Sequence, residues 1–130
     1  MNSQHAPDHE LTLRVIPMPK DSNAAGDVFG GWIMSQVDLA GSVLACAHAK
    51  GRVVTVAVNS FVFKEPVFVG DLCSFYSKIE KVGRTSMQVH VEVFSQQRLQ
   101  PSQGVKVTEA YLTYVAVDDT RTPRPVAPLA

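Results

Sequence analysis

The sequence is short of the features that mark secreted, membrane or nucleic-acid-binding proteins. It has two cysteines, too few for a disulfide framework, and positions 46 and 73 lack the spacing of metal ligands. Its 12 basic and 12 acidic residues cancel, which gives no support for binding nucleic acid. No apolar run approaches the ~20 residues of a membrane span, and the polar start lacks the core of a signal peptide. We expect a cytoplasmic protein that binds neither nucleic acid nor a membrane, with Cys46 and Cys73 as reduced, packed thiols.

A chain of 130 residues is long enough for one domain with its own core. Residues 1–9 are polar and are expected to be frayed. Residues 10–117 are expected to form a single domain, because no internal repeat marks a second unit. Residues 118–130 contain three prolines and are expected to form an irregular tail.

Hydrophobic patterning predicts one long helix and five strands. The alternation of apolar and polar residues in most of these segments is typical of strands. The run VVTVAVNSFVF has few polar breaks, which predicts a strand buried on both faces. In chain order the expected elements are a strand at 10–16, a helix at 31–49, and strands at 53–63, 71–82, 85–95 and 105–117, with a hairpin turn at Gly83 and Arg84.

This order predicts an α+β fold in which an antiparallel five-stranded sheet wraps around one long central helix. Short connections among the last four strands favour antiparallel pairing. One helix covers only part of such a sheet, and strands that are apolar on both faces need a further cover. Because a second subunit would supply that cover, we expect a dimer.

The stretch DSNAAGDVFGGWIMSQVDLAG at 21–41 is a loop that leads into the predicted helix. Asp38 lies among small or apolar residues at helical neighbour positions, so we expect its carboxylate to be poorly solvated. It is off the apolar stripe, whose members recur at the spacing of one helical face: Ile33, Val37, Ala40 and Leu44.

The start of this helix suits a carbonyl oxygen. The first turn leaves backbone N–H groups without internal partners and carries the positive end of the helix dipole, so the amides of Gly30 and Gly31 can meet a polarised carbonyl. Asp38 follows eight residues after Gly30, about 12 Å along the helix axis. If both groups serve one reaction centre, as we hypothesise, Asp38 must come from an antiparallel copy of the helix in a second subunit.

The sequence resembles the hotdog-fold acyl-CoA thioester hydrolases of the YciA and brain acyl-CoA hydrolase type. The resemblance lies in three stretches, of which the first is the most specific: DSNAAGDVFGGWIMSQVDLAG at 21–41, GRVVTVAVNSFVFKEPVFVGD at 51–71 and KVGRTSMQVHVEV at 81–93. It implies the hotdog fold and hydrolysis of short or fatty acyl-CoA thioesters to a free acid and CoA. No cofactor is implied, because CoA is part of the substrate and product. Homodimers that assemble further into a trimer of dimers are also implied, with active sites at the dimer interface.

The resemblance also implies roles for individual residues. Asp38 matches the catalytic carboxylate, Gly30 the backbone donor to the thioester carbonyl, and Asn23 the side chain that orients water or substrate. Many relatives have histidine before the paired glycines, where this chain has Phe29. The carboxylate would act either as a general base on water or as a nucleophile that forms a mixed anhydride, and the sequence does not choose between these. Asn23 is also typical of a turn, and the glycines of close helix packing.

The phosphates of CoA call for cations at the mouth of the site. Arg84, with Thr85 and Ser86 beside it, is the first candidate for this contact and Lys64 is the second. Gly31 is expected to add a backbone donor to substrate binding.

The four histidines have no plausible Cys or Asp partner in the sequence, which disfavours a serine triad or a zinc site, and no metal is expected. These histidines are His5, His9, His48 and His90. His48 lies near the end of the helix, where it suits the dipole, and Gly51 is expected to form the C-terminal cap.

Two alternatives to a hydrolase remain at this point. A hotdog dehydratase would also act on acyl thioesters, but it typically relies on an active-site histidine, and the loop and helix start contain none. A non-catalytic acyl-CoA sensor or assembly module would bind the same ligand and would tolerate loss of Asp38, whereas a hydrolase would not.

Overall fold

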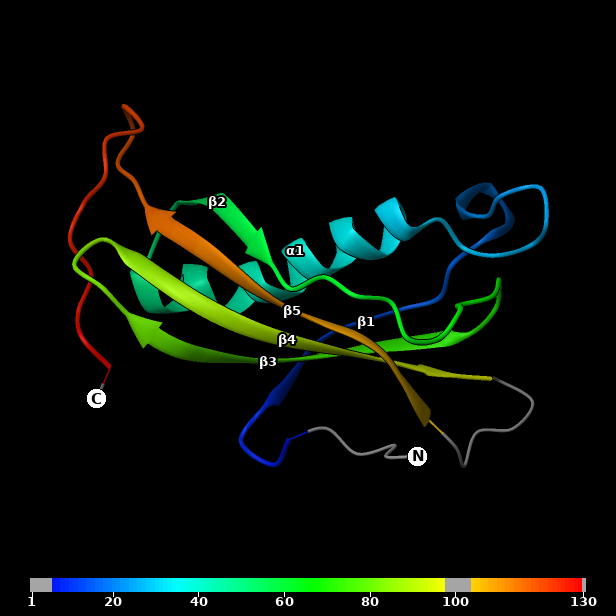
Figure 1. The fold of residues 1–130 in the computed structure, drawn as a ribbon. Coiled ribbons are helices and arrows are strands. Elements are labelled where there is room, and N and C mark those ends of the chain that lie inside the picture. The colour runs from blue at the N-terminus through cyan, green and yellow to red at the C-terminus, as the bar shows by residue number, and fades with distance from the viewer. Residues whose placement is uncertain (1–5, 98–103, 130) are drawn as a thin grey trace.

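The computed structural model describes residues 6–97 and 104–129 of the chain. They form five strands, one long α-helix and a short 3-10 helix (Figure 1). In chain order the elements are β1 (Glu10–Val15), η1 (Pro19–Asp21), α1 (Gly30–Ala49), β2 (Val53–Asn59), β3 (Leu72–Val82), β4 (Ser86–Gln96) and β5 (Gly104–Ala116). The predicted order of one strand, one helix and four strands is confirmed, as is the turn between β3 and β4.

The five strands form one antiparallel sheet in the order β1-β3-β4-β5-β2. After α1 the chain does not pair β2 with the next strand, β3, but with β5, which places β2 at one edge of the sheet and β1 at the other. The sheet curves along one side of α1 (Figure 1). This arrangement confirms the predicted sheet around a central helix.

The core lies between α1 and the sheet. From α1, the predicted stripe is buried except for Leu44 at its margin, which is half-buried, and Gly41, Ala45 and Ala49 complete the buried face. Full burial of one such Val or Ile side chain contributes about 1.5–3 kcal/mol. From β4, every second residue is fully buried in the same cluster: Met87, Val89, Val91 and Val93.

The two ends of α1 differ slightly from the prediction. The helix begins at Gly30, one residue early. The predicted cap at Gly51 is wrong, because Lys50 adopts the left-handed conformation (φ 57°) and donates its N–H to the Cys46 carbonyl. His48 lies in the last turn, as expected, and its ring also hydrogen-bonds the Ala127 carbonyl at 2.6 Å.

The prediction that the segment 53–63 is a strand buried on both faces is wrong for the single chain. The strand β2 ends at Asn59, and Thr55, Val56 and Val58 along it are exposed. A continuous apolar run does not distinguish a central strand from an edge strand whose apolar side chains face another molecule. The exposed edge is therefore consistent with the dimer expected from the sequence.

The two cysteines differ in environment. Cys73 on β3 is buried, whereas Cys46 is exposed on α1, so the prediction of a packed thiol is wrong for Cys46. Cys46 lies on the face of α1 that is turned away from the core. No helix within the described part of the chain is long and apolar enough to cross a membrane. The cytoplasmic location stays a prediction.

Residues 1–9 were expected to be frayed, and residues 1–5 of this segment lie outside the described residues. Residues 6–9 are held against the sheet: the Ala6 N–H donates to Glu92 at 2.9 Å, and His9 is buried. Polar composition suggested fraying, but here the polar groups bind polar side chains on the sheet. The tail after β5 is also attached, since the Val126 N–H donates to the Arg84 carbonyl.

Candidate active site

The N-terminus of α1 has no side-chain cap. The N-cap residue is Phe29, which cannot accept a hydrogen bond through its side chain, and the first turn contains no acidic residue. The N–H groups of Trp32 and Ile33 both turn back to the Phe29 carbonyl. Within residues 6–97 and 104–129, the N–H groups of Gly30 and Gly31 have no acceptor. Two backbone donors at the positive end of the helix dipole therefore remain available to a ligand.

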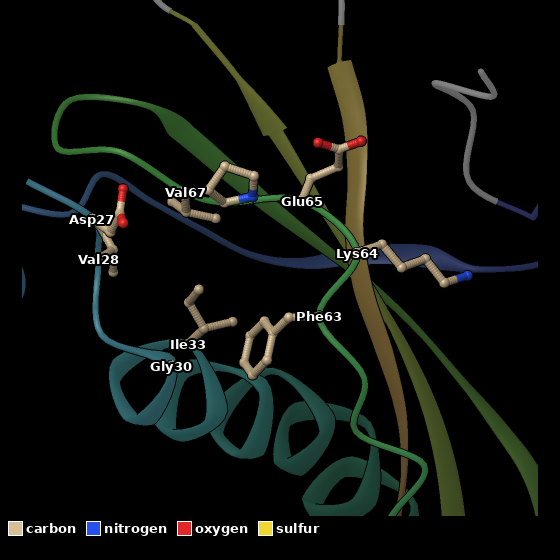
Figure 2. A pocket seen from close by; sticks show the side chains of 9 residues that line it. Asp27, Val28, Gly30, Ile33, Phe63, Lys64, Glu65 and Val67 are labelled. Carbon is tan, nitrogen blue, oxygen red and sulfur yellow. The ribbon is translucent and has the colours of Figure 1, made fainter.

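An open cavity of about 400 Å³ lies beside these donors, within the range of about 300–1,000 Å³ of small-molecule sites. It is lined by the start of α1 and by the connection from β2 to β3: Asp27, Val28, Gly30, Ile33, Phe63, Lys64, Glu65, Pro66 and Val67. Figure 2 shows Ile33, Phe63 and Val67 turned towards the hollow, so its interior is apolar.

Packing at Gly30 is tight for a side chain. A Cβ atom added to Gly30 would lie 3.3 Å from the Phe63 ring, whereas nothing lies within 4 Å of a Cβ atom added to Gly31. The ring of Phe63 thus covers one side of the helix start, and the Gly31 side stays open. A ligand that reaches the two amides would have to approach from the open side.

Asp38 lies two turns further along α1 and does not line this cavity. Its side chain is half-buried and accepts a hydrogen bond of 2.6 Å from the hydroxyl of Thr55 on β2. Its backbone carbonyl accepts one of 2.7 Å from the hydroxyl of Tyr114 on β5. Burial, and secondly the charge of Asp38, raise the pKa of the Tyr114 phenol above its ordinary value, so Tyr114 stays a hydrogen-bond donor. Both contacts hold this part of α1 against the β2 edge of the sheet.

Asn23 is a turn residue in the loop before α1. Its side-chain oxygen accepts hydrogen bonds from the N–H groups of Ala25 at 2.9 Å and Asp27 at 3.2 Å. The side-chain NH₂ of Asn23 has no hydrogen-bond partner among the described residues. The interpretation of Asn23 as a turn residue is thus correct, and the two NH₂ hydrogens remain available to a ligand.

The candidate phosphate contacts fall into two places. Lys64 lines the cavity, but its side chain extends away from the hollow (Figure 2), and its Nζ lies 3.7 Å from Oε2 of Glu109. Arg84, Thr85 and Ser86 lie at the turn between β3 and β4, at the opposite end of the sheet from the start of α1 (Figure 1). One chain therefore brings Lys64 near Gly30 but does not bring Arg84 or Asp38 there.

Sequence reasoning missed three residues that shape this region. Thr55 is the one polar residue in the run VVTVAV, a signal that could have marked it as the partner of a polar group. Tyr114 and Phe63 gave no such signal, because an aromatic residue in an apolar run is typical of any core. Their contacts with α1 depend on the strand order, which the sequence alone does not fix.

Comparisons with known proteins agree on one family. The model of the Thioesterase superfamily matches residues 25–102. The chain is 47% identical over 124 residues to the acyl-CoA thioester hydrolase YciA of Salmonella typhimurium, covering 94% of this chain and 93% of that protein. It is similar to a hexameric thioesterase from Yersinia pestis, with a TM-score of 0.87 and 43% identity over 94% of this chain and 99% of the other. It is equally similar to a hexameric hotdog fold thioesterase of Campylobacter jejuni, with a TM-score of 0.87 and 44% identity over 94% and 93%.

Proposed function

Because this chain belongs to the thioesterase superfamily and has the hotdog fold, we propose that it hydrolyses acyl-CoA thioesters at a site shared by two subunits. Its relatives over nearly the whole chain are acyl-CoA thioester hydrolases, so thioester hydrolysis is its activity. The observation that carries the proposed site is the uncapped start of α1, which opens beside an apolar cavity. The apolar hollow suits an acyl chain, and the amides suit the thioester carbonyl.

The amides of Gly30 and Gly31 would stabilise the charge that develops on the carbonyl oxygen. Attack on a thioester moves negative charge onto this oxygen, and fixed donors bind that charge more strongly than they bind the neutral substrate. Loss of one such donor typically lowers kcat by ~10²–10³-fold. A side-chain cap would occupy the same donors, which explains why Phe29 is compatible with activity at the N-cap.

The carboxylate would come from Asp38 of the partner subunit. Within one helix, Gly30 and Asp38 are separated by about 12 Å, so one carbonyl cannot contact both. An antiparallel pair of helices brings the two together if the two-fold axis passes near the midpoint, Met34. This axis also places Phe29 of one helix opposite Leu39 of the other, and these apolar residues are 51% and 56% exposed.

The surface around this axis is suited to a second copy of the chain. Large apolar side chains with more than two-fifths of their surface exposed gather on α1, on β2 and on the segment after β2: Met34, Leu39, Val43, Val56, Val58, Val62 and Phe63. An exposed apolar edge strand is a template for pairing with another chain. Relatives from Yersinia pestis and Campylobacter jejuni are hexamers, so we expect dimers of this kind to assemble further into a trimer of dimers.

The same two-fold relation explains why the candidate phosphate contacts lie apart. In one chain the turn with Arg84, Thr85 and Ser86 lies at the end of the sheet where α1 finishes (Figure 1). The Ala116 N–H donates to the Thr85 carbonyl, and Ala116 pairs with Val53, the first residue of the strand that follows α1. An antiparallel partner would carry this turn towards the start of the first α1. The Arg84 guanidinium of one subunit would then bind CoA phosphates whose acyl group lies in the other subunit's cavity.

Two routes of hydrolysis are compatible with this site. Asp38 either takes a proton from water, whose oxygen bonds to the carbonyl carbon, or attacks that carbon itself and forms a mixed anhydride that water then cleaves. In both routes the carbon–sulfur bond breaks, and the leaving CoA thiolate takes up a proton. The Thr55 hydroxyl fixes one carboxylate oxygen of Asp38, which leaves the other to react. Asn23 would orient the water or the substrate through its side-chain NH₂.

The two alternatives are less well supported. A hotdog dehydratase typically relies on an active-site histidine, and none of the residues that line the cavity is a histidine. A non-catalytic acyl-CoA sensor would not need a carboxylate positioned by Thr55 on the face of α1 next to the exposed β2 edge.

The test is Asp38→Asn, assayed by release of free CoA thiol from acyl-CoAs of several chain lengths. We expect kcat to fall by ~10²–10⁴-fold, the range for loss of an acid–base group, with the oligomer unchanged in size-exclusion chromatography. Asp119→Asn is the matched control, because Asp119 is exposed in the tail beyond β5. Turnover of Asp38→Asn within a few-fold of the wild type would end the assignment of Asp38 and would favour the sensor.

A further inference from the structure

The outer face of the sheet, turned away from α1, carries a cluster of ionisable side chains. Strand β4 points Val89 and Val91 into the core, so His90 between them points to the opposite face. There it meets His9 from the N-terminal segment, residues 6–9, which lies against this face (Figure 1). Both imidazoles are buried, with 8% of His9 and 7% of His90 exposed.

A continuous line of hydrogen bonds runs through the two imidazole rings. Nδ1 of His9 lies 2.9 Å from Oδ1 of Asp8, and Nε2 of His90 lies 2.7 Å from Oε1 of Glu109. A carboxylate only accepts, so each of these outer nitrogens carries a hydrogen. The inner nitrogens, Nε2 of His9 and Nδ1 of His90, lie 2.7 Å apart and share one hydrogen between them. The two inner nitrogens therefore face the same point, and one of them donates the shared hydrogen to the other.

A third group faces the same point. Glu80 on β3 places its Oε1 3.9 Å from Nδ1 of His90. One ligand atom from each of His9, Glu80 and His90 lies within 4.8 Å of the others. Ligands at about 2.0–2.2 Å from a tetrahedral metal ion are roughly 3.3–3.6 Å apart, so movements of about 1 Å would complete the set. Glu80 lies at the surface, where its side chain can make such a movement without disturbing the core.

We propose that His9, His90 and Glu80 form a binding site for a divalent transition-metal ion, of which Zn²⁺ fits best. Two imidazoles and one carboxylate are ligands that zinc prefers, and a water molecule would take the fourth position. The metal replaces the hydrogen between the two rings, which leaves to solvent as a proton.

The outer hydrogen bonds are the strongest argument for a metal. A metal-bound histidine almost always donates its other ring N–H to a carboxylate, a carbonyl or water, which fixes the ring and the tautomer. Both histidines already have this partner, Asp8 for one and Glu109 for the other. Tyr111 stacks on His90 with ring centroids 4.5 Å apart and further restricts that ring. The site is thus arranged for metal before a metal enters.

The ion would fasten the N-terminal segment to β3 and β4. No pattern in the sequence marks this site, because His9 and His90 are 81 positions apart and become neighbours only when the segment lies on the sheet. The prediction that these histidines lack a Cys or Asp partner is wrong for His9, which bonds Asp8, whereas His90 bonds a glutamate, Glu109. The site lies on the face of the sheet opposite α1, so its role would be structural and independent of thioester hydrolysis.

The test uses untagged, chelator-treated protein titrated with Zn²⁺ against a competing metal dye, and with Co²⁺ followed by its visible absorption. We expect one Zn²⁺ per chain, a Co²⁺ spectrum typical of nitrogen and oxygen ligands in a tetrahedron, and a higher Tm with Zn²⁺ present. Glu80→Gln and His9→Gln should abolish all three effects. Asp8→Ala, which removes the outer hydrogen-bond partner of His9 together with the ion pair between Asp8 and Lys78, should weaken Zn²⁺ binding by ~10–100-fold.

His48→Gln is the matched control, because His48 lies on α1 outside the cluster, and it should bind Zn²⁺ as the wild type does. Glu80→Gln should fold as the wild type does, since the Glu80 side chain is at the surface. The proposal is overturned if the wild type does not bind Zn²⁺ saturably, or if Glu80→Gln and His9→Gln bind it as tightly as the wild type. In either case the cluster would be a hydrogen-bonded clasp without a metal.

Discussion

The glycine at position 41, in the middle of α1, makes room for one hydroxyl group. A Cβ atom added there would lie 2.5 Å from the Tyr114 hydroxyl, which donates to the Asp38 carbonyl. We expect Gly41→Ala to lower the free energy of unfolding by about 1–3 kcal/mol, because overpacking outweighs the gain of about 1 kcal/mol in helix propensity. Chemical denaturation of the variant would measure this.

Two further variants test the cause. Gly41→Ala combined with Tyr114→Phe should be more stable than the sum of the two single changes predicts, because the clashing oxygen is gone. Gly31→Ala should lose no stability, since nothing lies within 4 Å of its added Cβ. Equal losses for Gly31→Ala and Gly41→Ala would show that the hydroxyl is not the cause.

A second prediction at this scale concerns Cys73. Burial, and secondly the charge of Asp71, raise the pKa of its thiol to about 12. In the unfolded chain the thiol ionises near pH ~8.5, so above that pH the unfolded state holds fewer protons than the folded state and stability falls. The slope approaches about 1.4 kcal/mol per pH unit. Between pH ~8.5 and 10, before tyrosines titrate, urea unfolding of Cys73→Ala should show a flatter pH dependence than the wild type.

At the scale of elements, one substitution at the uncapped start of α1 should raise the stability of the protein and lower its activity. Phe29→Asp would place a carboxylate at the N-cap, where it accepts from the first-turn amides and stabilises the helix by about 0.5–2 kcal/mol. The same carboxylate would accept hydrogen bonds from the backbone N–H groups that we propose bind the thioester oxygen. We therefore expect a higher Tm together with a lower kcat, measured on one preparation.

Phe29→Ala controls for loss of the aromatic ring, and the Asp variant should be more stable and less active than the Ala variant. If Phe29→Asp were more stable and equally active, the amides at the start of α1 would not take part in the reaction.

The elements also show what a sequence can and cannot predict. The amphipathic stripe and the loop before it placed α1 to within one residue, because helix periodicity and glycine-rich loops are local signals. The apolar run that contains Val56 was misread as buried, because the pattern does not say which molecule covers it. His9 and His90 were missed because their contact depends on chain folding over a long separation. Of the predicted site residues, Gly30, Gly31 and Asp38 lie on α1, but the partner of Asp38, Thr55, follows only from the sheet edge beside the helix.

At the scale of the whole molecule, the shared site requires a defined relation between two chains. If Gly30 of one α1 meets Asp38 of the other, the two-fold axis passes near Met34, and a residue on such an axis lies next to its own copy. Antiparallel helices pack with their axes about 8–10 Å apart. The 44% exposure of Met34 in the single chain is consistent with a contact of this kind.

This relation is testable by crosslinking Met34→Cys with a short bismaleimide. The background is Cys46→Ser, which removes the exposed thiol, whereas Cys73 stays because it is buried. We expect a covalent dimer on a denaturing gel and no larger species, because each axis joins two chains.

Ala47→Cys in the same background is the control. It is exposed on α1 about 20 Å along the helix from Met34, so its two copies would be about 40 Å apart in an antiparallel pair and should not crosslink. Efficient crosslinking at 47 without crosslinking at 34 would mean that the helices pair in another register, and the carboxylate that serves the start of α1 would then not be that of Asp38.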